Sequence, residues 1–230
     1  MSKVKFLDKK TMITKQFWIR ASGIFGILGG LTLFAGDMLF YYSTDSINLN
    51  ANMGNASDFR IITSGVTALL AAWFYVLGVG QVYHAFQPSK LIYRTIVTCC
   101  LGAIVIAYGV IHGAFIGIAT SAKLAIEYDL NLDKSVNLAR KANEILRLFV
   151  YPIFALLSVF FIVLVWNKQT HYPKWILLFF PLLPFLIRDL ICDNLPQTYW
   201  VIVCGGYLNL ILIVFFTAST IALWKSPGKT

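Results

Sequence analysis

The sequence predicts an all-α polytopic membrane protein with six transmembrane helices and with both termini in the cytoplasm. Of its 230 residues, 58% are hydrophobic and only 13% are charged, whereas a soluble domain is roughly 45–50% apolar and about 25% charged. Apolar runs long enough to cross about 30 Å of hydrocarbon recur along the chain. Lysine and arginine concentrate in alternate connections, as the positive-inside rule requires of cytoplasmic segments. This composition excludes a water-soluble globule, a disordered chain and a disulfide-stapled secreted module.

Six apolar runs account for most of the chain. They are expected to span the membrane at about 18–42, 61–84, 92–118, 146–166, 174–193 and 199–224. Six crossings of about 20 residues each leave only short connections, so we expect residues 1–230 to form a single transmembrane helical domain. Backbone groups in lipid must be paired within their own segment, and the runs show no short alternating strands, which excludes a barrel.

The positions of the charges set the orientation of the helices. With the N-terminus inside, twelve of the nineteen Lys and Arg residues fall in cytoplasmic segments: Lys3, Lys5, Lys9, Lys10, Lys15, Arg20, Lys90, Arg94, Lys168, Lys174, Lys225 and Lys229. Nine of the ten carboxylates fall in the outer half: Asp37, Asp45, Asp58, Glu127, Asp129, Asp133, Glu144, Asp189 and Asp193. Membrane topology thus explains the net charge of +9, and nucleic acid is not an expected partner.

The first span, 18–42, combines a packing face with a carboxylate. Ser22, Gly26 and Gly30 recur every four residues, a pattern that lets helix backbones approach closely. Asp37 follows Gly30 by seven residues and therefore lies about 20° from it around the helix. We expect the Asp37 carboxyl on this packed face and not in lipid. The run is too long for the core of a signal peptide and is expected to remain as an anchor.

The second span, 61–84, ends in a short polar cluster that includes His84. Snorkelling to the cytoplasmic interface explains this cluster. His112 is expected in the opposite leaflet and His171 in a cytoplasmic loop, so we expect no two of the three histidines to share a metal. Walker, dinucleotide-binding and serine-elbow sequences are also missing. We therefore expect neither a cofactor nor a metal site.

The third span repeats the small-residue pattern at Gly109, Gly113 and Gly117. His112 lies beside this face, and Tyr108 lies one turn below it. Two interpretations of the imidazole stay open. It is either a structural group satisfied by a neighbouring carbonyl or carboxylate, or a group that contacts a ligand.

The fourth helix is expected to begin in water, before the span that starts at residue 146. In the preceding outer connection, apolar residues recur at helical spacing: Val136, Ala139, Ala142, Ile145 and Leu146. An amphipathic helix of this kind can run from the surface into the membrane and form a partial lid.

The last two spans carry further polar groups near their outer ends. In the fifth, Arg188 and Asp189 follow Pro181 and Pro184, and such prolines can kink a helix or free carbonyl groups for ligands. In the sixth, Asn209 lies a turn after two glycines. Both spans thus bring polar side chains to the outer half.

Cys192 and Cys204 flank the last outer loop. On the oxidising side of the membrane they could form a disulfide. They could also remain free thiols that pack as small apolar groups. The sequence leaves both alternatives open.

Five ionisable or amide groups from four spans are expected at a common depth near the outer surface. With Tyr108 they form the candidate ligand-binding set of one outward-open cavity: Asp37, Tyr108, His112, Arg188, Asp189 and Asn209. The alternative is a purely structural bridge between Asp37 and Arg188. A lone charge at the bilayer centre costs about 2.5–3.5 kcal/mol, so each charge must be paired or hydrated.

Three functions remain open. The first is a binding or transport module that takes a small polar or amphiphilic molecule into the outward-open cavity. The second is a membrane-embedded enzyme acting on an outer-leaflet lipid or isoprenoid, with His112 and Asp37 as the candidate catalytic acid–base pair and Arg188 holding an anionic head group. The third is a structural scaffold, in which the glycine faces serve helix packing or homo-oligomerisation. Membrane lipid is the expected partner of all three.

Four short motifs lie within or at the ends of the expected spans. They are Gly36-Asp37, Tyr83-His84-Ala85-Phe86-Gln87-Pro88, Ile111-His112-Gly113-Ala114-Phe115 and Gly205-Gly206-Tyr207-Leu208-Asn209. In these motifs the chain resembles an uncharacterised family of bacterial six-span integral membrane proteins, a domain-of-unknown-function group. The resemblance covers most of the chain and implies a multi-pass protein of the bacterial inner membrane. Asp37, His112 and Asn209 are motif positions to which the family lends no role.

Overall fold

The structure, a computed structural model, describes the backbone of residues 2–224 and the side chains of residues 14–224. Within that part of the chain it is helical and has no strand. Four long helices form the bundle: α1 (Ser2–Tyr41), α3 (Asp58–Ala85), α4 (Leu91–Glu127) and α5 (Leu132–Trp166). Shorter helices complete it: α2 (Leu49–Gly54), η1 (Lys174–Leu178), α6 (Leu182–Leu186), α7 (Arg188–Cys192), α8 (Gln197–Trp200), η2 (Val201–Gly205) and α9 (Tyr207–Ala222). The predicted all-α fold is confirmed.

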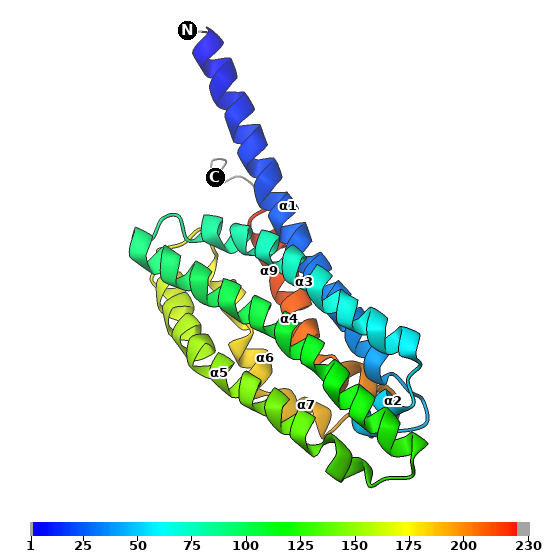
Figure 1. The fold of residues 1–230 in the computed structure, drawn as a ribbon. Coiled ribbons are helices and arrows are strands. Elements are labelled where there is room, and N and C mark those ends of the chain that lie inside the picture. The colour runs from blue at the N-terminus through cyan, green and yellow to red at the C-terminus, as the bar shows by residue number, and fades with distance from the viewer. Residues whose placement is uncertain (1, 225–230) are drawn as a thin grey trace.

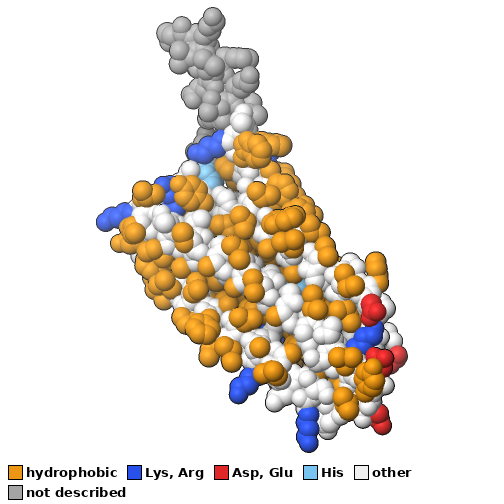
Figure 2. Space-filling view, in the orientation of Figure 1, with side chains coloured by type: hydrophobic (Ala, Val, Ile, Leu, Met, Phe, Trp, Pro, Cys, Tyr) orange, Lys and Arg blue, Asp and Glu red, His pale blue; other side chains and the backbone are white. Residues whose placement is uncertain are grey.

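Four helices are long and apolar enough to cross a membrane, and a fifth span is added if Gln197–Gly205 and Tyr207–Ala222 count as one. These two segments meet at an angle of 64°. Apolar side chains cover the middle of the molecule in Figure 2, and acidic side chains gather at one end. These features indicate a membrane protein. Of the lysines expected in the cytoplasm, Lys225 and Lys229, and the side chains of Lys3, Lys5, Lys9 and Lys10, lie outside the described residues.

The expected fifth helix, 174–193, is not continuous. This segment forms three short helices, η1, α6 and α7, and it runs along the bundle between α5 and α9 (Figure 1). Pro181 and Pro184 explain the interruption. A proline lacks the N–H that a helix interior needs, and it disfavours helical geometry in the residue before it.

Small residues hold α1 against α3. A Cβ added at Gly78 would lie 2.6 Å from the Cα of Gly26, so the two backbones are in direct contact, as the small-residue pattern of the first span predicts. The matching pattern in α4 is used only at Gly109, where a Cβ would lie 3.2 Å from a carbonyl of α3. No described atom lies within 4 Å of a Cβ at Gly113, and at Gly117 the nearest lies at 3.8 Å.

The α5 helix begins at Leu132, well before residue 146, as the sequence predicts. The expected apolar face is only partly buried. Val136 is fully buried, whereas Ile145 and Leu146 are exposed. The polar Asn143 is buried against α4, so the buried face of α5 is apolar with one polar residue at the level of the cavity.

A disulfide joins Cys192 at the end of α7 to Cys204 in η2, with their Cα atoms 5.8 Å apart. This bond decides between the two alternatives that the sequence leaves open for these cysteines. Next to it, the helix breaks at Gly206 between η2 and α9. The hydroxyl of Tyr41 donates a hydrogen bond of 2.6 Å to the carbonyl of Gly205, which ties this break to the end of α1.

Candidate functional site

A cavity of about 520 Å³ is lined by residues of α1, α2, α4, α5, α6, α7, η2 and α9. The positions of α2 and α7 place it toward the end of the bundle opposite the labelled N and C ends (Figure 1). Its volume lies within the range of ligand pockets, roughly 300–1,000 Å³. All six residues predicted as ligand-binding line it: Asp37, Tyr108, His112, Arg188, Asp189 and Asn209.

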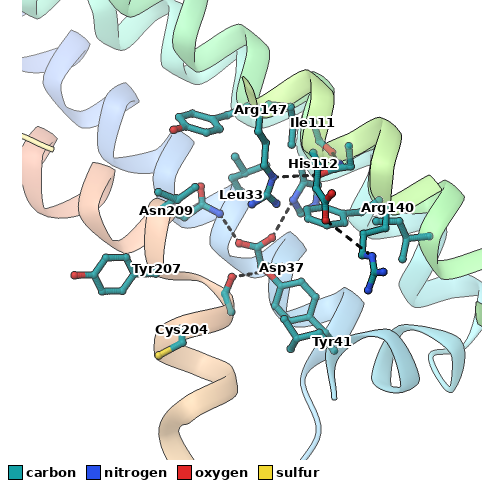
Figure 3. A pocket seen from close by; sticks show the side chains of 18 of the residues that line it. Leu33, Asp37, Tyr41, Ile111, His112, Arg140, Arg147, Cys204, Tyr207 and Asn209 are labelled. Carbon is teal, nitrogen blue, oxygen red and sulfur yellow. Dashed lines mark hydrogen bonds and ion pairs between the residues drawn. The ribbon is translucent and has the colours of Figure 1, made fainter. Parts of the chain in front are cut away.

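Three of these residues form one buried cluster, which we call the cavity floor: Asp37 of α1, His112 of α4 and Asn209 of α9 (Figure 3). The Oδ1 atom of Asp37 lies 3.1 Å from Nδ1 of His112. The amide of Asn209 donates a hydrogen bond of 2.5 Å to the other carboxylate oxygen. The three residues are 5%, 3% and 6% exposed, respectively. Both oxygens of the carboxylate therefore have partners within the protein.

The expected bridge between Asp37 and Arg188 is wrong. Arg188 instead pairs with its chain neighbour Asp189, with 2.9 Å between Nη1 and Oδ1. The reason is the break in the fifth segment. The α7 helix starts at Arg188, so its side-chain directions follow a separate five-residue helix rather than one continuous span.

The two short contacts of Ser64 in α3 determine that Nε2 of His112 carries a proton. Its Oγ lies 2.6 Å from the carbonyl oxygen of Gly36 and 2.9 Å from Nε2 of His112. A carbonyl group only accepts, so the single hydroxyl proton goes to Gly36, and Nε2 must donate to Ser64. The other ring nitrogen, Nδ1, lies 3.1 Å from Oδ1 of Asp37.

Ser64, His112 and Asp37 are thus linked in the order of a Ser-His-Asp catalytic triad. Accessibility separates this group from a working triad. Ser64 is 0% exposed and does not line the cavity, and its proton is directed away from the imidazole. Both ring nitrogens of His112 are bonded to protein atoms. The chain of hydrogen bonds therefore holds the cavity floor in place and exposes no nucleophile.

Gly36 makes room for this arrangement. A Cβ at this position would lie 2.1 Å from Oγ1 of Thr67 and 2.8 Å from Nε2 of His112. Any larger residue would displace the imidazole from Ser64. The Gly36-Asp37 motif thus combines a small residue that admits the ring of His112 with a carboxylate that bonds it.

Four polar residues of α5 also line the cavity and were not predicted from the sequence: Arg140, Asn143, Glu144 and Arg147. The amide of Asn143 donates to the carbonyl of Ile111 at 2.9 Å, and Nε of Arg147 donates to Oδ1 of Asn143 at 3.0 Å. Their spacing of three, four and seven residues is the signal that could have found them, because it places all four on one helix face.

A second histidine contact lies outside the cavity. The rings of His84 and His171 stack with their centroids 5.2 Å apart, a contact that the expected positions of the two residues do not predict. The loop after α5 returns to α3, where the amide of His171 donates to the carbonyl of Ala85. Burial lowers the pKa of His171, and nearby Lys15 lowers it further. Among the described residues, no third His, Cys, Asp or Glu completes a metal-binding group with them.

Comparison with known proteins places the chain in a family. The model of a family described as "Family of unknown function (DUF6796)" matches residues 9–226. The chain belongs to this family. Membership confirms the resemblance to an uncharacterised family and assigns no activity to the cavity. No curated protein and no solved structure matches the chain.

Proposed function

We propose that the protein is a binding or transport module that takes a small polar or amphiphilic molecule into the cavity. The observation that carries this proposal is a cavity of about 520 Å³ lined by both charged and apolar side chains. Protein interiors are close-packed, and voids larger than a few waters are rare. A scaffold that serves only helix packing has no need of such a space.

The alternative of a membrane enzyme is less well supported. General acid–base catalysis requires a ring nitrogen or a carboxylate oxygen within hydrogen-bond reach of the substrate. Both nitrogens of His112 are bonded to Asp37 and Ser64. The cavity floor is better suited to orienting a bound molecule than to exchanging protons with it.

Native mass spectrometry of the protein released from its own membrane tests this proposal. We expect one small molecule to stay bound to the wild-type protein. Leu208→Trp, which places a bulky ring on the cavity wall, should abolish this adduct. The control Leu186→Trp changes an exposed residue of α6 and should leave it intact. An adduct unaffected by Leu208→Trp would contradict the proposal, and conversion of the molecule into a new mass would favour the enzyme.

We further propose that the chain crosses the membrane six times with both termini in the cytoplasm. The disulfide between Cys192 and Cys204 supports this orientation, because disulfides persist on the oxidising side of a membrane. The broken segment from η1 to α7 would then be the fifth crossing, and the bent pair of α8–η2 and α9 the sixth. The resemblance to bacterial multi-pass proteins supports the bacterial inner membrane as its location.

Cysteine accessibility tests this topology. Asp129 and Gln169 are exposed residues of the turns that follow α4 and α5, respectively. A membrane-impermeant maleimide should label Asp129→Cys in intact cells and label Gln169→Cys only after permeabilisation. The parent protein, whose free cysteines Cys99 and Cys100 lie within α4, gives the background. Labelling of Gln169→Cys in intact cells would contradict the proposed orientation.

A further inference from the structure

Arg147 is held at one end of its guanidinium group and open at the other. Its Nε donates to Asn143, and its guanidinium carbon lies 5.4 Å from the ring centroid of Phe115. No hydrogen bond joins Nη1 or Nη2 to any residue within 14–224. Figure 3 shows the side chain pointing into the cavity. Arginine in this state presents its two terminal nitrogens to an anion in a fixed position.

The other charges of the cavity are already balanced. Every carboxylate that lines it has a partner: Asp37 has His112, Glu144 has Arg140 at 3.9 Å, and Asp189 has Arg188. Among the residues with described side chains, no carboxylate lies within 4.0 Å of Arg147. Arg147 is therefore a positive charge without a carboxylate partner among these residues. A cation in a largely apolar surrounding favours an anionic ligand.

A narrow apolar crevice of about 20 Å³, room for about one water molecule, adjoins the cavity. Nine apolar side chains and Tyr108 line it: Leu101, Ile104, Phe154, Leu157, Pro181, Phe185, Leu208, Ile211 and Leu212. Tyr108, Phe185 and Leu208 also line the cavity, so the two spaces share a wall. The crevice lies between α4, α5, α6 and α9, where the interrupted fifth segment replaces a continuous helix.

From these observations we infer that the ligand is an anionic amphiphile, with a phosphate or carboxylate head group on Arg147 and its hydrocarbon part against the apolar side chains of the cavity. This inference rests on the proposed binding function and specifies its ligand class. The guanidinium group of Arg147, which has no carboxylate partner among the described side chains, accounts for the head group. Apolar side chains of the cavity, among them Leu33, Ile111 and Phe115, account for a hydrocarbon part, because they offer nothing to a fully polar solute.

Three probes separate the head group from the chain: decyl phosphate, decan-1-ol and inorganic phosphate. Binding to the purified protein is counted as mass adducts over a range of probe concentrations. We expect decyl phosphate to saturate a single site. Decan-1-ol has the same chain without the charge, and inorganic phosphate has the charge without the chain. Each should bind at least tenfold more weakly than decyl phosphate. Losing a hydrogen bond to a charged group lowers the binding affinity by roughly that factor.

Arg147→Gln should weaken decyl phosphate binding roughly tenfold or more. Arg147→Lys, which keeps the charge but loses the planar fork, should bind with intermediate affinity. The control is Lys141→Gln in α5, at an exposed residue that does not line the cavity. It also removes one positive charge, and it should change decyl phosphate binding by less than about threefold because exposed charges are screened. An unchanged elution volume on gel filtration shows that each variant is folded.

The outcomes separate this inference from the proposed function. Equal binding of decyl phosphate to Arg147→Gln and to wild type, equal losses in Arg147→Gln and Lys141→Gln, or inorganic phosphate binding as well as decyl phosphate would each overturn the anionic amphiphile. A neutral native molecule that is displaced by Leu208→Trp, but not affected by Arg147→Gln, would overturn it too and leave the binding function standing. Only an adduct that persists unchanged in Leu208→Trp would contradict both the anionic amphiphile and the binding function.

Discussion

Asp37→Ala is expected to lower the free energy of unfolding by about 3–5 kcal/mol, the loss typical when one partner of a buried pair is removed. The carboxylate lies between His112 and Asn209, and both partners are buried. Alanine leaves their polar nitrogens without a partner, and a buried unpaired polar group carries its full desolvation cost. The unfolding midpoint in mixed detergent micelles measures the effect.

Asp37→Asn should cost much less, about 1 kcal/mol or below, because its hydrogen bonds can be rebuilt. The asparagine oxygen can accept from Asn209, and its amide can donate to Nδ1 of His112, whose Nε2 still donates to Ser64. The control Asp189→Ala removes another carboxylate of the cavity. Its side chain is 84% exposed, so little stability should be lost. If Asp37→Asn proved as damaging as Asp37→Ala, the cavity floor would need the charge of the carboxylate and not only its hydrogen-bonding capacity.

The sequence predicts which residues meet at the cavity floor because helices that cross a membrane have few degrees of freedom. A fixed rise per residue converts position into depth, and a period of 3.6 residues converts spacing into direction. Asp37 could therefore be placed on the packed face that carries Gly26 and Gly30. His112 could be placed at a similar level. The structure brings the two side chains together in the cavity.

The partners of these residues could not be predicted, because they depend on how the chain departs from ideal helices. The fifth segment breaks at its prolines, which turns Arg188 toward Asp189 instead of Asp37. Arg147 falls at the start of the expected span 146–166, but its contacts with Asn143 and Phe115 depend on how α5 packs against α4. The contact between His84 and His171 depends on the path of a loop, which no periodicity encodes.

Gly78→Ala is the second substitution with a large expected effect. The added methyl group would lie 2.6 Å from Cα and 2.8 Å from N of Gly26. These are backbone atoms, so no side chain can rotate away, and α1 must move from α3. Overpacking of this kind costs about 1–3 kcal/mol and more where the backbone has to shift, and we expect at least the upper end of that range. A lowered thermal midpoint in detergent measures the loss.

Gly102→Ala is the matched control for Gly78→Ala, because no described atom lies within 4 Å of a Cβ at Gly102. Alanine is a better helix former than glycine by about 1 kcal/mol, so this variant should be neutral or slightly stabilised. A displaced α1 would also carry Asp37 away from His112 and Asn209. Gly78→Ala should therefore weaken ligand retention as well as stability, while Gly102→Ala changes neither. Equal thermal midpoints for the two variants would show that the close approach of α1 and α3 does not hold the cavity floor in place.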